Sequence, residues 1–223
     1  MKIAIIGYGK MGHAIEEYAR QIGYDVACTI DRDDPWPDKM EADVAVEFTT
    51  PQTAVENLHR CFDRHVPVVC GTTGWYDHYT KVCEECQRLA GTMLTATNFS
   101  LGMNIMFALN EQLARYMSRY NYKVGIAETH HVHKLDAPSG TAITLQQQIV
   151  ENGNRDVDDV PIVSYRVGEV PGTHTVQYDS PVDTITLTHE AHSREGLAQG
   201  ALLAAEWLVN ADPGVYTMRD VLV

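Results

Sequence analysis

Hydrophobic residues follow two different patterns along the chain. Up to about residue 100, short apolar runs such as 2–6 and 43–48 alternate with segments in which apolar residues recur every three or four positions. The short runs are typical of buried parallel strands, and the spaced segments are typical of amphipathic helices. This alternation predicts an α/β domain with a Rossmann-type parallel sheet.

The pattern changes from residue 122 onward to one strand, one helix and then several strands. Segments 173–178 and 183–191 alternate polar and apolar residues, which is typical of strands with only one face on a core. They predict an α+β domain with an open mixed sheet, and an open sheet favours pairing between subunits. Apolar residues return at helical spacing beyond Arg194.

Three glycines directly follow the first predicted strand, at Gly7, Gly9 and Gly12. In the dinucleotide fingerprint the first gives a tight turn, the second lets the pyrophosphate approach, and the third lets the helix pack on the strand. A second predicted strand, 25–30, ends at Asp31, about 20 residues later, where a carboxylate can accept hydrogen bonds from a ribose. A dinucleotide site is predicted, with a purely structural glycine turn as the alternative.

The cofactor preference stays open at this stage. Asp31 favours NADH because a 2′-phosphate would meet its negative charge. Arg32 and Lys10 are close enough in the sequence to pair with that phosphate. Either NADH or NADPH therefore fits the pattern.

The stretch 128–142, ETHHVHKLDAPSGTA, gathers three histidines, one lysine and a helix start. If residues 130–134 leave the end of a strand, their side chains form a rim where a proton donor and an anion receptor can meet. Ser139 reads as the N-cap of the next helix, whose first amides, at Gly140 and Thr141, can bind an anion. The same residues also fit a polar loop, a chance metal site or a simple cap.

Composition excludes several classes of protein. The net charge of -13 argues against nucleic-acid and anionic-membrane binding, which need basic surface, and 44% hydrophobic residues suffice for a sizeable core. The apolar run at the start is too short for a signal peptide, and no later run approaches a membrane span, so a cytoplasmic protein is expected.

Five cysteines, an odd number, predict reduced thiols rather than a disulfide framework. Cys83 and Cys86 form a CxxC, but it lies in a predicted helix without a second pair. The two glutamates between them raise rather than lower a thiol pKa. No redox or metal site is predicted.

The segment HHVHKLDAPSGTA closely resembles the signature of the bacterial dihydrodipicolinate reductases (4-hydroxy-tetrahydrodipicolinate reductases) of lysine and diaminopimelate biosynthesis. The likeness continues through GYGKMG, CGTTG, TNFSLG and the closing TMRDVL. It implies an NAD(P)H-dependent oxidoreductase that reduces (hydroxy)tetrahydrodipicolinate to tetrahydrodipicolinate. It also implies a dinucleotide-binding domain at 1–100 and 195–223, a substrate-binding and oligomerisation domain at 101–194, and a homotetramer.

The likeness also assigns catalytic roles. His130 is expected to donate the proton that follows the hydride, and Lys134 to hold the substrate as a cation and serve as an acid. An imidazole with its ordinary pKa of ~6.5 gives up a proton near neutral pH more readily than an ammonium of pKa ~10.4. His133 has a structural role, and Arg194 occupies the place of a family arginine near the substrate.

The substrate carboxylates are expected to contact His131, Lys134, Gly140 and Thr141. The cofactor, NADH or NADPH, is expected to contact Gly7, Tyr8, Gly9, Lys10, Met11, Gly12, Asp31, Arg32, Gly71, Thr72, Thr73, Thr97, Asn98, Phe99 and Ser100. The loop after Asp31 is shorter than in many members, and Lys10 stands where arginine is common. Both departures fall on the adenosine side.

Two other classes of protein remain as alternatives. A different two-domain dehydrogenase, such as one acting on an amino acid, would keep the glycine motif but has no reason to contain HHVHKLDAPSGTA. A non-catalytic nucleotide sensor could keep the first domain while losing His130 and Lys134, which are both present. Hydride transfer to the dipicolinate-type substrate separates the three.

Overall fold

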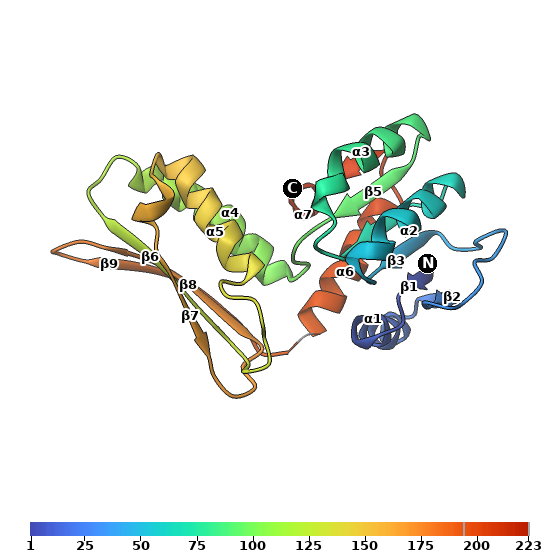
Figure 1. The fold of residues 1–223 in the computed structure, drawn as a ribbon, viewed down its shortest axis with the longest axis horizontal. Helices are drawn as coiled ribbons and strands as arrows, with labels where there is room; N and C mark the ends of the chain where they lie inside the picture. The colour runs from blue at the N-terminus through green and yellow to red at the C-terminus, as the bar shows by residue number, and fades with distance from the viewer. Residues whose placement is uncertain (194, 223) are drawn as a thin grey trace. The chain divides into compact units, whose positions relative to one another are not determined.

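The structure is a computed structural model that describes residues 1–193 and 195–222 (Figure 1). The chain divides into two compact units, one formed by Met1–Leu101 with Glu195–Val223 and the other by Gly102–Arg194. Arg194, a candidate substrate-binding residue, lies outside the described residues. Within the described ranges, no helix combines the length and the apolar character needed to cross a bilayer.

A six-stranded sheet in the order β10-β5-β4-β3-β1-β2 forms the centre of the first unit. Its strands are β1 (Lys2–Ile6), β2 (Asp25–Ile30), β3 (Val44–Glu47), β4 (Val68–Cys70), β5 (Thr92–Thr95) and β10 (Gly214–Tyr216). All neighbouring strands run parallel, as helical crossovers between strands require. The predicted Rossmann-type parallel sheet is confirmed.

Helices cover both faces of this sheet. They are α1 (Lys10–Gln21), α2 (Pro51–Asp63), α3 (Tyr79–Arg88), α6 (Glu195–Leu208) and α7 (Met218–Val221), with a short 3-10 helix at Tyr76–His78. Ile3 and Ile5 join the core formed with α1 and α6, whereas Ala4 and Ile6 join the core formed with α2 and α3. Side chains alternate across a strand, so the uninterrupted apolar run of β1 supplies both cores.

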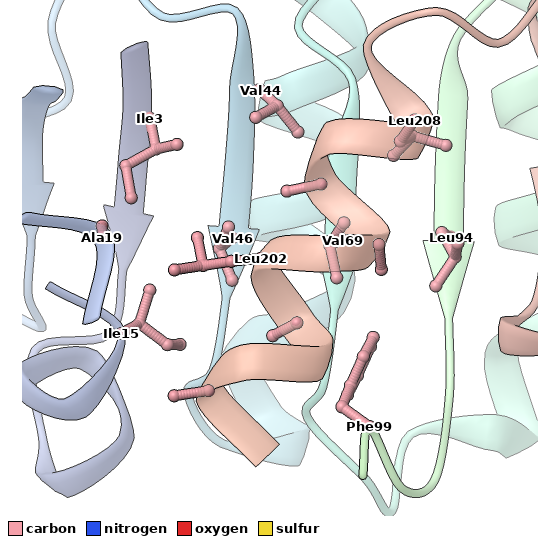
Figure 2. Packing of buried hydrophobic residues seen from close by; sticks show 14 of the residues in the cluster. Ile3, Ile15, Ala19, Val44, Val46, Val69, Leu94, Phe99, Leu202 and Leu208 are labelled. Carbon is pink, nitrogen blue, oxygen red and sulfur yellow. The ribbon is translucent and has the colours of Figure 1, made fainter. Parts of the chain in front are cut away.

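Helix α6, which comes late in the chain, packs directly on the parallel sheet. Figure 2 shows its Leu202 and Leu208 among side chains of the strands, such as Val69 and Leu94. A Cβ added at Gly200 would lie 1.7 Å from the Phe99 carbonyl oxygen, so only glycine allows this approach. Truncating either buried leucine to alanine should cost ~2–5 kcal/mol of stability.

The second unit has a four-stranded mixed sheet in the order β7-β6-β8-β9. Its strands are β6 (Lys123–His130), β7 (Ile162–Arg166), β8 (Gly172–Asp179) and β9 (Thr184–Ala191). Strand β6 is parallel to β7 and antiparallel to β8, which is antiparallel to β9. Helices α4 (Leu101–Met117) and α5 (Gly140–Gly153) cover one face, with a 3-10 turn at Val157–Asp159 (Figure 1). The predicted open mixed sheet is confirmed.

Strand β6 runs two residues further than the apolar pattern predicted. The pattern ended at Glu128, but Thr129 pairs with Thr173 of β8 and His130 pairs with Arg166 of β7. The backbone ladder therefore extends the strand through polar residues. Because side chains alternate along a strand, Glu128 and His130 share the face that α4 and α5 cover.

Candidate active site

The glycine loop after β1 owes its shape to two close backbone approaches. A Cβ on Gly7, whose φ is +91°, would lie 2.0 Å from the Phe48 carbonyl oxygen, and one on Gly12 would lie 2.2 Å from the Gly7 carbonyl oxygen. Gly9 differs, because nothing lies within 4 Å of its added Cβ. It is the N-cap of α1 and makes no side-chain cap. The loop therefore leaves open space at a helix start, where a pyrophosphate can meet backbone amides.

A cavity of about 340 Å³ lies beside this loop, within the size range of cofactor sites. Its lining includes Gly7, Gly9, Asp31 and Arg32 from the predicted set but not Lys10. The Asp31 amide donates to the Asp34 carboxylate at 2.8 Å, which fixes the turn after β2. The cavity thus combines the predicted ribose carboxylate with a nearby cation.

Sequence reasoning missed Trp36 and Arg60, which also line this cavity. The Arg60 guanidinium carbon lies 5.1 Å from the centre of the Trp36 ring, and Arg60 also pairs with Glu56. The loop after β2 folds back on α2 through this contact. No local motif marks it, because Trp36 and Arg60 belong to segments that meet only in the folded unit.

The loops after β4 and β5 hold the remaining predicted cofactor contacts. The Thr72 hydroxyl is buried and accepts from the Thr49 amide at 2.7 Å, while the Phe99 ring is buried in the core. The Thr72 hydroxyl and the Phe99 ring thus already make contacts within the folded unit. Thr72 and Phe99 can therefore bind a cofactor mainly through their backbone groups. Thr73 and Thr97 are exposed, and the side-chain oxygen Oδ1 of Asn98 accepts from the Ser100 amide at 2.8 Å. Tyr8 and Met11 are half-buried and Lys10 is exposed, while Gly71 packs on the Phe48 ring.

His130 lies in the second unit, at the end of β6, and is 8% exposed. Its Nδ1 is hydrogen-bonded to Oε2 of Glu128, which is fully buried. The other carboxylate oxygen, Oε1, accepts from Nη2 of Arg166 at 2.9 Å. Two strands therefore supply an arginine–carboxylate–histidine chain.

Burial lowers the pKa of His130, with a further lowering from the charges of Lys134 and Arg166. The Glu128 carboxylate opposes this shift, but the net pKa is below the usual imidazole value. The expectation of an ordinary imidazole is therefore corrected, because the sequence does not show the desolvation at this position.

Lys134 lies in the loop after β6 and is paired with a neighbouring carboxylate. Its Nζ is 2.8 Å from Oδ1 of Asp136, and the lysine side chain is 23% exposed. Burial opposes ionisation of Asp136, but the Lys134 ammonium holds the Asp136 pKa below its usual value. A substrate carboxylate would share this ammonium with Asp136 or displace it.

The start of α5 lies against the same cluster. Ser139 is the predicted N-cap, and its hydroxyl accepts from the Ala142 amide at 3.2 Å. The same hydroxyl is 3.1 Å from Nε2 of His174, whose ring meets that of His130 edge-on at 5.0 Å. Gly140 is exposed and Thr141 half-buried in the first turn of α5. The predicted helix start and the predicted proton donor therefore belong to one connected polar cluster.

His174 was not predicted, and burial together with His130 lowers its pKa to about 4. One ring nitrogen of His174, one ring nitrogen of His130 and one carboxylate oxygen of Glu128 lie within 4.8 Å of one another. These groups are chemically suited to a metal, but Glu128 already accepts hydrogen bonds from Arg166 and His130. The arrangement is accounted for without a cation.

His131 follows His130 and is half-buried, with its ring 6.0 Å from that of His133. The His133 Nε2 is 3.1 Å from the Glu169 carboxylate, and both side chains are mostly exposed. The structure links the Lys134 loop to Glu128 through Arg166. It links Ser139, at the start of α5, to His130 through His174.

Glu128, Arg166 and His174 are the functional candidates that sequence reasoning missed. A signal existed for Glu128, because a carboxylate two positions before a histidine shares its face of a strand. Arg166 and His174 had no such signal. They reach His130 and Glu128 through the β6–β7 and β6–β8 registers.

Family models match nearly the whole chain. The model described as "Dihydrodipicolinate reductase, N-terminus" matches residues 1–99, and "Dihydrodipicolinate reductase, C-terminus" matches residues 102–222. The 4-hydroxy-tetrahydrodipicolinate reductase of Christiangramia forsetii is 45% identical, over 100% of this chain and 98% of that protein. The reductase of the same name from Methanopyrus kandleri is 40% identical, over 82% of this chain and 72% of that protein.

Solved structures share the architecture. A dipicolinate-bound dihydrodipicolinate reductase from a Paenisporosarcina species has a TM-score of 0.82 at 22% identity, covering 97% of both chains. An aspartate dehydrogenase from Thermotoga maritima has a TM-score of 0.55 at 13% identity, covering 93% of this chain and 96% of that chain. These likenesses describe the fold, which several dehydrogenases share. The sequence matches over both halves are more specific, and they show that the chain belongs to the dihydrodipicolinate reductase family.

Proposed function

We propose that this chain reduces 4-hydroxy-tetrahydrodipicolinate, or the dihydrodipicolinate formed from it, to tetrahydrodipicolinate with NADH or NADPH. The reaction belongs to diaminopimelate and lysine biosynthesis. The observation that carries the proposal is the folded form of the family signature. His130 is buried and hydrogen-bonded to the Glu128 carboxylate, and the charge of the Lys134 ammonium lowers the His130 pKa. The start of α5 joins the same cluster through Ser139 and His174.

The reaction adds a hydride and a proton to the substrate. The reduced cofactor supplies the hydride, which arrives at C4 of the conjugated imine and leaves an electron pair that a proton must take at C3. His130 is the proton donor, through the ring nitrogen that Glu128 does not hold. From the 4-hydroxy substrate, one water is lost in addition, so the balance is substrate, NAD(P)H and a proton giving tetrahydrodipicolinate, NAD(P)⁺ and water.

The substrate carries two carboxylates, and the cluster supplies complementary groups. Lys134 gives a cation, His131 gives a ring N–H, and Gly140 and Thr141 give amides at the positive end of α5. A bound dicarboxylate also adds negative charge beside His130. That charge raises the His130 pKa, so substrate binding favours the protonated form of His130 before the proton is transferred.

Both cofactors are expected to be used. Asp31 and Asp34 disfavour a 2′-phosphate, whereas Arg32 and Arg60 favour it, and all four line the same cavity. The opposing charges support dual use, with a ratio that depends on the balance between them.

The chain is further proposed to be a cytoplasmic homotetramer that pairs through the open sheet of the second unit. The face opposite α4 and α5 carries Val163, 48% exposed, and Tyr165, 51% exposed. Two such apolar residues beside the small Gly125 and Ala127 suit a flat contact between sheets. Light scattering on the protein and on Tyr165→Glu tests the assembly, which the added charge should weaken.

The function is tested by mixing the purified protein with the condensation product of pyruvate and aspartate semialdehyde. Oxidation of NADH and NADPH is followed separately by the absorbance of the reduced nicotinamide. Rapid oxidation that requires both condensation partners supports the proposal. A protein that binds NADH but oxidises neither cofactor would instead be another dehydrogenase or a nucleotide sensor.

A further inference from the structure

Arg166 is the last residue of β7 and lies opposite His130 in the parallel register. Its guanidinium reaches well beyond Glu128. Nε donates to the Lys134 carbonyl oxygen at 3.3 Å, and Nη2 donates to the Asp136 carbonyl oxygen at 2.6 Å. One side chain therefore contacts both the carboxylate behind His130 and the backbone of the loop that carries Lys134.

Glu128 divides its two oxygens between Arg166 and His130. The Glu128 side chain is fully buried. Burial alone would favour its neutral form, but hydrogen bonds from Ser164, Arg166 and His130 hold the Glu128 pKa below its usual value. An ionised carboxylate with no solvent contact has few alternative positions, because moving it would break a charge-assisted hydrogen bond.

The surroundings of His130 distinguish its two ring nitrogens. Nδ1 is taken by Glu128, and a carboxylate can only accept a hydrogen bond at that position. On the other side, a Cβ added to Gly172 would lie 3.0 Å from Nε2. A larger residue at position 172 would therefore crowd Nε2.

We propose that Glu128 and Arg166 are positioning residues for the reduction. Glu128 accepts a hydrogen bond from the Nδ1–H group of His130 and so fixes the orientation of the imidazole. Nε2 is then the ring nitrogen that delivers the proton to the substrate. Arg166 fixes Glu128 and also holds the loop of Lys134. The roles of His130 and Lys134 in this statement rest on the proposed function, whereas the hydrogen-bonded arrangement itself does not.

The first test is the kinetics of Glu128→Gln, which preserves the shape of the side chain and removes its charge. We expect kcat to fall by ~10- to ~100-fold, with little change in the substrate KM. Activity should fall as rising pH removes the His130 proton, and we call this part of the pH profile the His130 pH limb. In Glu128→Gln this pH limb should move to lower pH, since the carboxylate no longer stabilises the imidazolium. A purely structural role would not move that limb.

Glu169→Gln is the matched control, because Glu169 also pairs with a histidine, His133, but on an exposed surface. It should leave kcat and the pH limb unchanged.

Arg166→Lys keeps the positive charge but loses the planar guanidinium that holds several acceptors at once. It should lower kcat and raise the substrate KM, because the Lys134 loop loses its anchor as well.

The second test uses nitrogen NMR of the histidines in the unaltered protein, with His130 assigned from the spectrum of His130→Gln. Neutral His130 should carry its proton on Nδ1, and Glu128→Gln should lower the His130 pKa. A proton on Nε2 in the neutral ring, or a Glu128→Gln variant with unaltered kcat and pH limb, would overturn the proposal. The NMR result on the unaltered protein decides the arrangement even if Glu128→Gln fails to fold. Absence of reductase activity in the unaltered protein would instead refute the proposed function.

Discussion

The two units build their candidate sites in different ways. In the first unit the glycine loop is shaped by backbone contacts within a short segment, such as that of Gly12 with Gly7. In the second unit, side chains from three strands meet, as Glu128, Arg166 and His174 do around His130. A site made by one loop can be recognised in a sequence, whereas a site made across a sheet depends on strand register.

Removing the proposed catalytic groups should have the largest effect. His130→Gln and Lys134→Ala should each lower kcat by ~10²-fold or more, because the first removes the proton donor and the second the substrate cation. NADH affinity, measured by fluorescence titration, should stay nearly unchanged, since the predicted cofactor contacts are on loops of the first unit. Loss of NADH binding in either variant would contradict the role assignment.

Glycine substitutions test the contrasting region. Gly7→Ala places a methyl group 2.0 Å from a carbonyl oxygen, so it should destabilise the first unit by ~1–3 kcal/mol and abolish NADH binding. Gly9→Ala meets open space, and it should weaken NADH binding while leaving the melting temperature nearly unchanged. Equal losses of stability in thermal unfolding of the two variants would argue against a separate cofactor role for Gly9.

Asp31→Ser should shift cofactor preference toward NADPH by ~10-fold in the ratio of kcat/KM values, because it removes a negative charge from the ribose side. Asp33→Ser is the matched control, since Asp33 is exposed and is not part of the cavity lining. Steady-state rates with both cofactors measure the ratio. An unchanged ratio for Asp31→Ser would place the ribose elsewhere.

The pH dependence should show the smallest but most specific effect. In the proposed mechanism, activity requires protonated His130, so it should fall as pH rises through the His130 pKa. Burial holds this pKa below the ordinary value of ~6.5 in the free enzyme, so the limb in kcat/KM should lie below that value. The limb in kcat should lie higher, because the bound dicarboxylate stabilises the imidazolium. If the kcat and kcat/KM profiles fell at the same pH, substrate binding would not favour protonation of His130.

The sequence alone predicted both sheets except for the edge strand β10, because uninterrupted apolar runs mark the parallel strands and alternating runs mark β8 and β9. It also predicted the Ser139 cap, which depends only on local chemistry. The family was predicted from the HHVHKLDAPSGTA signature, and the sequence matches confirm it.

The rest depended on contacts between distant segments. The extension of β6 to His130 required pairing with Arg166, and the lowered His130 pKa required its burial. Likewise, Trp36 lines the cavity beside the glycine loop only because the loop after β2 folds onto Arg60. Sequence periodicity shows which face of a strand a residue occupies, but it does not show what covers that face.

The most direct measurement is to follow the hydride itself. The protein is given the condensation product of pyruvate and aspartate semialdehyde with NADH or NADPH deuterated at both C4 positions of the nicotinamide. Mass spectrometry of the product should show tetrahydrodipicolinate with one deuterium at its C4, formed far more slowly by His130→Gln. Cofactor oxidation without deuterium in the product, or no oxidation by a protein that binds NADH, would contradict the account.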